Sequence, residues 1–76
     1  MAEAIVWSKD NCAACNTAIA LLDQHGFSVE IRKIDGIKWK VEDLKKEVPS
    51  ARMVPQIFIE GLLIGTLNEL KEYLNG

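Results

Sequence analysis

The sequence predicts one α/β domain with the element order βαβαββα, in which three helices flank a four-stranded mixed sheet. Two observations lead to this class. Along the chain, the spacing of apolar residues alternates between every second residue, which is typical of strands, and every third or fourth residue, which is typical of helices. Two apolar runs separated by Gly61 indicate a hairpin, whose strands are antiparallel because the link is short. The βαβ unit before it crosses over in the right-handed sense and makes its own strands parallel.

The first half of the chain predicts a strand, a helix and a second strand. Residues 4–7 form a short apolar run that fits a buried strand. A helix follows from Cys12 to His25, because apolar residues recur on one of its sides, and Gly26 suits the C-terminal cap. Apolar and polar residues then alternate over residues 27–34, which is the pattern of a half-buried strand.

The next part of the chain predicts a second helix and the hairpin. An apolar stripe at helical spacing runs over residues 37–48 and stops before Pro49, which places Trp39 on this helix. Residues 56–60 and 62–64 are the two apolar runs of the hairpin.

The chain ends in a predicted third helix. Thr66 is followed three residues later by Glu69, a spacing that is typical of a capping box at a helix start. Leu67, Leu70 and Leu74 then form an apolar stripe at helical spacing. We expect this stripe to face the sheet.

Composition and charge limit the classes of function. The chain has 76 residues and a net charge of −2, and its lysines are interleaved with acidic residues, so no basic face suited to nucleic acid is expected. No apolar run approaches the roughly 18 residues of a membrane span, and the N-terminus carries no charged leader. We therefore expect a cytoplasmic protein that binds neither nucleic acid nor a membrane.

The strongest chemical signal is the pair Cys12 and Cys15, the only cysteines of the chain, directly after the first predicted strand. Cysteines two residues apart at a strand-to-helix junction can close into a small disulfide, which predicts thiol-disulfide exchange. The positive end of the helix would stabilise the thiolate of Cys12 as nucleophile, helped by Lys9 and opposed by Asp10. Cys15, one turn inside the helix, would remain a buried thiol and act as the resolving group.

Three stretches of the chain together resemble the glutaredoxin family of the thioredoxin-fold class. They are Lys-Asp-Asn-Cys-Ala-Ala-Cys at residues 9–15, Met-Val-Pro-Gln-Ile-Phe-Ile at residues 53–59 and Ile-Gly-Thr-Leu-Asn-Glu-Leu at residues 64–70. A CxxC pair alone is a weak signal, but the three stretches match in order and spacing. The resemblance implies a thioredoxin-like fold and a single glutaredoxin-like domain over residues 1–76.

The resemblance also implies an activity. Members of the family are glutathione-linked thiol-disulfide oxidoreductases, so the chain would reduce protein disulfides or glutathione mixed disulfides through Cys12 and Cys15. Glutathione would be the co-substrate, and no cofactor would be tightly bound. The partners would be glutathione and disulfide-containing proteins, with ribonucleotide reductase as one candidate, and the chain would act as a monomer.

A glutathione site follows from the same resemblance. Pro55 would be a cis proline that faces the reactive cysteine, and the backbone of Val54 would pair with the backbone of glutathione. An X-Pro bond reaches the cis form at a cost of only about 0.5–1 kcal/mol. Lys9 and Arg52 would approach the carboxylates of glutathione. The contacts to its γ-glutamyl carboxylate and amino group would come from Gly65, Thr66 and Asn68.

Departures from the family pattern keep other interpretations open. Asn68 stands at the family's usual Asp position, and a weaker glutathione site would leave thioredoxin reductase as the electron source. Ala13 and Ala14 replace the usual Pro-Tyr between the cysteines, and this leaves room for an iron-sulfur cluster that two chains would hold through Cys12. Two inert buried cysteines are a further alternative. A zinc site is discounted because His25 is the only histidine.

Overall fold

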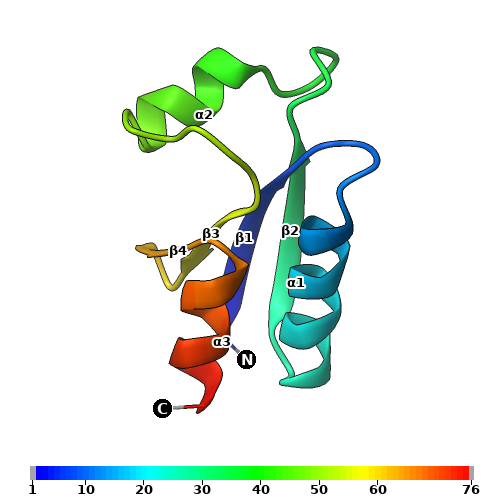
Figure 1. Cartoon of the computed structure of the whole chain (residues 1–76), viewed down its shortest axis with the longest axis vertical. Helices are drawn as coiled ribbons and strands as arrows, with labels where there is room; N and C mark the ends of the chain where they lie inside the picture. The colour runs from blue at the N-terminus through cyan, green and yellow to red at the C-terminus, as the bar shows by residue number, and fades with distance from the viewer. Residues whose placement is uncertain (1, 76) are drawn as a thin grey trace.

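The computed structural model of the chain describes residues 2–75 and has the predicted order of elements (Figure 1). The elements are β1 (Glu3–Ser8), α1 (Ala13–Gln24), β2 (Ser28–Lys33), α2 (Val41–Glu47), β3 (Gln56–Ile59), β4 (Leu62–Gly65) and α3 (Leu67–Asn75). The strands lie in the order β2-β1-β3-β4. β1 and β2 are parallel and the other pairs are antiparallel, which confirms the mixed sheet. Among the described helices, none is long and apolar enough to cross a membrane.

The helices lie on both faces of the sheet, because successive residues of β1 point to opposite sides. Val6 packs in a core cluster with Leu22 of α1 and Leu70 of α3. The next residue, Trp7, packs in a second cluster with Leu44 of α2. The sheet therefore has α1 and α3 on one face and α2 on the other.

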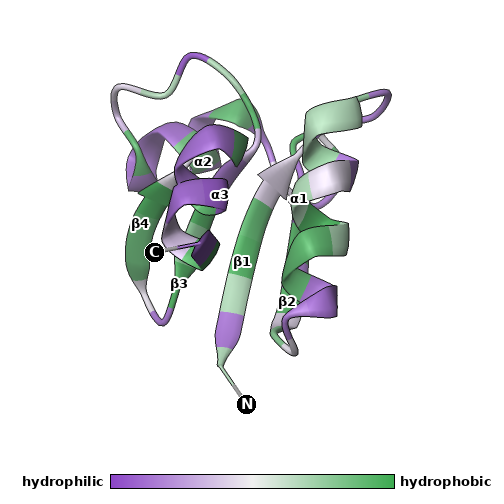
Figure 2. Cartoon of the chain, turned by 60° about the horizontal axis from the view of Figure 1, so that its bottom comes forward, coloured by the Kyte–Doolittle hydropathy of each residue, from purple (hydrophilic) through white to green (hydrophobic). Residues whose placement is uncertain are grey.

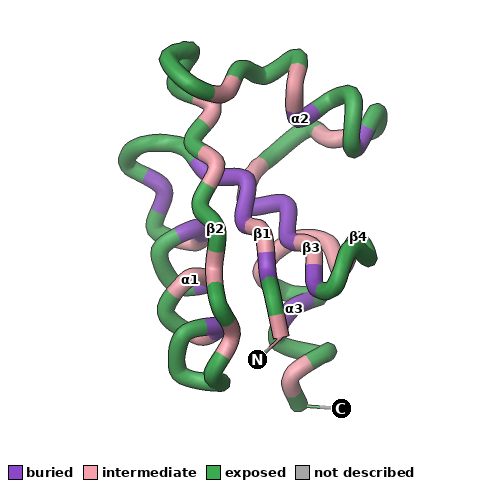
Figure 3. The backbone as a smooth tube through the Cα atoms, turned by 180° about the vertical axis from the view of Figure 1, so that it is seen from behind, coloured by how far each residue is buried: buried purple, intermediate pink, exposed green. Residues whose placement is uncertain are grey.

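Hydropathy and burial follow this layering. Hydrophobic residues extend along β1 and β4, whereas α2 and α3 carry many hydrophilic ones (Figure 2). Buried residues gather on β1, β3 and one side of α1, whereas no residue of β4, at the edge of the sheet, is buried (Figure 3). The loop after β1 and the loop before β3 thus both extend from buried strands at the centre of the sheet.

The first helix is one residue shorter at each end than predicted, because Cys12 and His25 are its caps. Cys12 has extended backbone angles, and its sulfur accepts a hydrogen bond from the N–H of Cys15. At the other end, Gly26 has a φ of 82° and allows the N–H of Phe27 to reach the carbonyl of Leu22 at 3.0 Å. The predicted role of Gly26 in ending the helix is confirmed.

The hairpin is confirmed, but its turn includes Glu60, which the sequence pattern assigns to a strand. Glu60 and Gly61 both have positive φ values, 51° and 80°. A two-residue link of this kind matches the right-handed twist of the strands that it joins. Glu60 therefore belongs to the turn rather than to β3.

The second helix begins later than predicted, and Ile37 and Trp39 lie outside it. Asp35 accepts a hydrogen bond from the N–H of Ile37 at 3.0 Å, and Gly36 adopts a φ of 88°, so a turn replaces the first helical turn. The helix begins after Lys40, whose N–H donates to Asp43 at 2.8 Å. Ile37 is exposed as a result.

Trp39 is part of an aromatic cluster under α2. Its ring meets Trp7 edge-on with the ring centroids 5.3 Å apart. The guanidinium of Arg32 lies over Trp39 at 4.3 Å from the ring centroid. Trp39 thus packs against Trp7 of the sheet, and it fixes the end of the loop that leads into α2, directly before the N-cap Lys40.

The start of the third helix has one half of the predicted capping box, the bond from the N–H of Thr66 to the side chain of Glu69. The N–H of Thr66 donates to the carboxylate of Glu69 at 2.8 Å, and the Thr66 hydroxyl also bonds to this carboxylate. These bonds lower the pKa of Glu69 from its ordinary value, and the bond from the Thr66 hydroxyl contributes more than the bond from the backbone N–H. Because the ionised form is the better acceptor, the cap is strongest when Glu69 is charged.

Glu69→Ala is expected to lower the melting temperature at neutral pH, since the N–H of Thr66 then loses its partner. A carboxyl with a lowered folded-state pKa adds stability above its unfolded pKa and loses that stability as the pH falls through its folded pKa. The melting difference should therefore shrink in strongly acidic buffer. Circular dichroism melts at both pH values test this, with Glu72→Ala on the same helix as control. An equal difference at both pH values would contradict it.

Candidate functional site

Cys12 and Cys15 are joined in a disulfide at the N-terminus of α1, with their Cα atoms 5.3 Å apart. Cys15 is fully buried, and Cys12 is 8% exposed. The N–H of Cys15 lies 3.1 Å from the Cys12 sulfur, and the sulfur takes the position of an N-cap oxygen. When the disulfide opens, this N–H and the positive end of the helix both stabilise a thiolate on Cys12. The geometry suits Cys12 to thiolate chemistry and keeps Cys15 away from solvent.

The loop between β1 and α1 brings charged groups next to the pair. Asn11, directly before Cys12, has a φ of 56°, a conformation that asparagine tolerates better than most residues. Asp10, which we expected to oppose the Cys12 thiolate, forms an ion pair with Lys33 of β2 at 3.1 Å. That pairing weakens the opposing charge. Lys9 is exposed and makes no ion pair among the described residues.

The loop before β3 carries the Val54-Pro55 bond, which is cis as the resemblance implies. Pro55 is buried at the start of β3 and Val54 is half-buried. The side chain of Gln56 donates a hydrogen bond to the carbonyl of Met53 at 2.9 Å, and this bond closes the loop on itself. Gln56 is 7% exposed, so the bond lies away from solvent.

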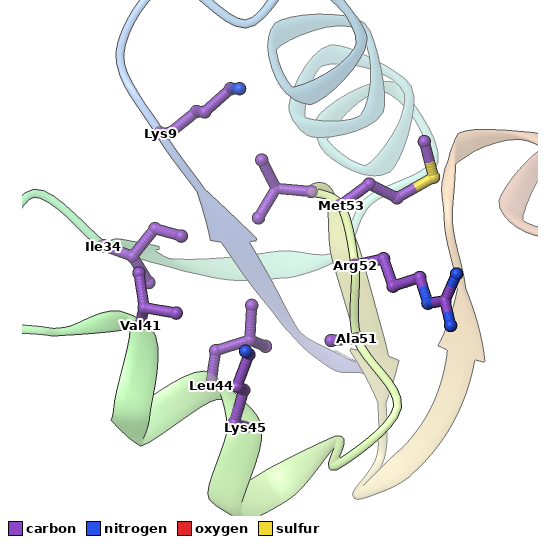
Figure 4. Close-up of a pocket in the computed structure, with 9 residues that line it drawn as sticks. Lys9, Ile34, Val41, Leu44, Lys45, Ala51, Arg52 and Met53 are labelled. Atoms are coloured by element: carbon purple, nitrogen blue, oxygen red, sulfur yellow. The ribbon is translucent and has the colours of Figure 1, made fainter.

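A pocket of about 420 Å³ lies between the end of β1, α2 and this loop (Figure 4). Three of the residues that the resemblance assigned to glutathione line it, namely Lys9, Arg52 and Val54. Lys45 and the apolar residues Ile34, Val41, Leu44, Ala51 and Met53 complete the lining. The pocket therefore brings together one set of the expected binding residues.

Gly65, Thr66 and Asn68 lie at the junction of β4 and α3 and do not line this pocket. Pro55 and the cysteine pair are not among its lining residues either. Gly65 has a φ of 123°, and a side chain there would meet Glu69, because an added Cβ would come within 2.9 Å of its carboxylate. The N–H of Thr66 is already bound to Glu69. Asn68 is exposed in the first turn of α3.

Several residues of this region were not predicted from the sequence. Lys33 meets Asp10, 23 residues away in the chain, only through the fold, and no sequence pattern indicated the local bond of Gln56 to Met53. Lys45 had a weak signal, since it follows Val41 by four residues and so lies on the same face of a helix. Among residues 2–75, no three His, Cys, Asp or Glu side chains are grouped to hold a metal ion.

Comparisons with known proteins match this geometry. The glutaredoxin family model matches residues 4–64. Glutaredoxin 3 of Escherichia coli K12 is 37% identical over 70 residues, which cover 92% of this chain and 83% of that protein. Wheat glutaredoxin superposes with a TM-score of 0.83 at 28% identity, over 96% of this chain and 71% of the wheat chain. The buckwheat glutaredoxin-glutathione complex superposes with a TM-score of 0.80 at 27% identity, over 95% and 67% of the chains.

These matches cover most of the chain, including the cysteine pair and the loop before β3. They confirm the resemblance and the thioredoxin-like fold. The chain belongs to the glutaredoxin family of thiol-disulfide oxidoreductases, with Cys12 and Cys15 as its CxxC pair.

Proposed function

We propose that the chain reduces protein disulfides and glutathione mixed disulfides, with Cys12 as the nucleophile and Cys15 as the resolving thiol. The position of the Cys12 sulfur carries this assignment, since it caps α1 and accepts the N–H of Cys15 at 3.1 Å. A sulfur in this position is stabilised as the thiolate, which is the form that attacks disulfides. Cys15 is fully buried and is poorly placed to attack an outside substrate first.

The reaction proceeds by two exchanges. The Cys12 thiolate attacks one sulfur of the substrate disulfide, a new sulfur–sulfur bond forms, and the other substrate sulfur leaves as a thiolate that takes up a proton. The Cys15 thiolate then attacks the Cys12 sulfur, closes the disulfide seen in the structure and releases the second substrate thiol. Two molecules of glutathione reduce the Cys12–Cys15 disulfide and become glutathione disulfide.

The proposed glutathione site extends from the pocket to the start of α3. Lys9 and Arg52 approach the carboxylates of glutathione, and the backbone of Val54 pairs with its peptide backbone. The γ-glutamyl end binds at Gly65, Thr66 and Asn68. A ligand carboxylate at Thr66 takes over the N–H that now donates to Glu69. The glutathione complex of the buckwheat relative supports glutathione as the ligand.

The proposal predicts rapid turnover in a coupled assay. The purified protein should reduce a small glutathione mixed disulfide when glutathione, glutathione reductase and NADPH are supplied, because glutathione returns the Cys12–Cys15 pair to the dithiol. The consumption of NADPH is followed by absorbance, and it should rise in proportion to the protein added. A parallel assay replaces glutathione and its reductase with thioredoxin reductase. Turnover in the second assay alone would refute glutathione as the electron source.

The remaining expectations stay predictions. They are the single domain over residues 1–76, the monomeric state, the cytoplasmic location, ribonucleotide reductase as a substrate and the absence of a tightly bound cofactor. Anaerobic reconstitution with iron and sulfide, followed by absorption spectra and size measurement, tests the cluster-binding alternative.

A further inference from the structure

We propose that the pocket between the end of β1, α2 and the loop before β3 binds acidic residues of protein substrates, and that Lys45 selects for them. This inference rests on the proposed oxidoreductase function. The occupant is an extended segment of a disulfide-containing protein, in which Asp or Glu flanks the reacting cysteine and an apolar side chain enters the pocket. The reaction itself is unchanged, since the substrate disulfide gains two electrons that glutathione supplies through the Cys12–Cys15 pair.

The first argument for an acidic partner is the positive charge of the pocket lining. Lys9, Lys45 and Arg52 line it, and none of its lining residues is acidic. The chain as a whole has a net charge of −2, so the positive charge of the pocket is opposite in sign to that of the whole protein. Within residues 2–75, none of the three cations forms an ion pair. They are therefore available to carboxylates of a partner, which such a cleft attracts electrostatically.

The three cationic side chains point in different directions, which favours a partner with more than one carboxylate. Lys9 extends from the end of β1, Lys45 rises from α2 beside Leu44, and the guanidinium of Arg52 points away from both (Figure 4). Because the three groups come from separate segments and diverge, a single carboxylate does not engage all of them. An extended peptide with several acidic residues offers a separate carboxylate to each cation.

The apolar part of the lining supports a peptide as the occupant. Leu44 and Ala51 belong to the cluster around Trp7 and form a packed floor. Val41 and Met53, at the pocket itself, are 45% and 61% exposed. A bound segment would cover these two side chains, and the volume of about 420 Å³ is in the range of small ligand sites.

The helix that carries Lys45 also provides a matched control. Lys46 is the next residue, is exposed like Lys45, and does not line the pocket. Both lysines lie in the last turn of α2, so both interact in the same way with the negative end of the helix. Lys45→Glu and Lys46→Glu therefore change the net charge by the same amount at the same end of α2, and only Lys45→Glu changes the pocket lining.

The test uses two peptides of the same sequence around one intramolecular disulfide, flanked by Glu in one peptide and by Lys in the other. Steady-state kcat/KM is measured for each with glutathione and its reductase. The wild-type protein should prefer the acidic peptide by about tenfold in low salt and much less in high salt. Lys45→Glu should remove or reverse this preference through KM. Lys46→Glu should leave the ratio within about twofold.

The outcomes separate this inference from the proposed function. Equal rates for the two peptides with the wild-type protein, or equal effects of the two variants, would overturn the pocket proposal while disulfide reduction stands. No reduction of either peptide or of a small glutathione mixed disulfide would instead refute the proposed function. Thermal melts of all variants, together with the uncharged variant Lys45→Gln, distinguish a loss of substrate preference from a loss of folding.

Discussion

Cys12→Ser is expected to abolish the reduction of both glutathione mixed disulfides and protein disulfides, by at least about a thousandfold in kcat/KM. The cause is chemical, because a serine hydroxyl stays protonated where a thiol at a helix N-terminus ionises. The hydroxyl would still accept the N–H of Cys15, so the cap of α1 and the fold should persist. The coupled NADPH assay measures the loss, and circular dichroism checks the fold.

Cys15→Ser provides the contrast. Without the resolving thiol, the protein should still exchange with a glutathione mixed disulfide through Cys12, but it should stall as a mixed disulfide with a protein substrate. Mass spectrometry would detect that trapped species. Full activity of Cys12→Ser, or trapping on Cys15 in place of Cys12, would contradict the assigned roles.

Leu70→Ala is expected to give a large loss of stability, about 3 kcal/mol in the free energy of unfolding. Leu70 is fully buried and joins α3 to the cluster that also holds Val6, Leu22 and Ile57. A domain of this size is stable by only about 4–11 kcal/mol, so the change removes a large share of the total. Urea unfolding followed by tryptophan fluorescence measures it.

Tyr73→Ala on the same helix is the control for that measurement. Tyr73 is 51% exposed and lies outside the core cluster, so its loss should cost less than about 1 kcal/mol. Similar losses for the two variants would show that helix formation, rather than the packing of α3 on the sheet, sets the stability. Because Gly65 and Thr66 lie at the base of α3, a loosened helix would also disturb the proposed γ-glutamyl contacts.

Most of the fold was predictable from local patterns. The alternation over β2, the stripe of Leu67, Leu70 and Leu74, and the glycine at the hairpin each depend on neighbours in the chain. The pattern failed where two local signals competed. Ile37 continues the apolar stripe of α2, but Asp35 and Gly36 form a turn, and the hydrogen bond from Lys40 to Asp43 then sets the helix start.

The candidate site was predictable to a lesser extent. Cys12 and Cys15 are close in sequence, and their place at a strand-to-helix junction was sufficient to indicate the chemistry. The resemblance named Lys9, Arg52 and Val54, which the fold brings into one pocket. Neither line of reasoning revealed the pairing of Asp10 with Lys33, or Lys45 as a lining residue.

The sequence determines the elements and the chemistry but not the surroundings of the site, because the two depend on interactions of different range along the chain. Periodicity, caps and the CxxC spacing act over a few residues, and such effects specify elements and the type of chemistry. The parallel pairing of β1 with β2 brings Lys33 to Asp10, next to the cysteine pair in the chain. The packing of α2 against Trp7 places Lys45 in the same pocket as Lys9. Burial in a shared core decides these distant contacts, so they appear only once the chain has folded.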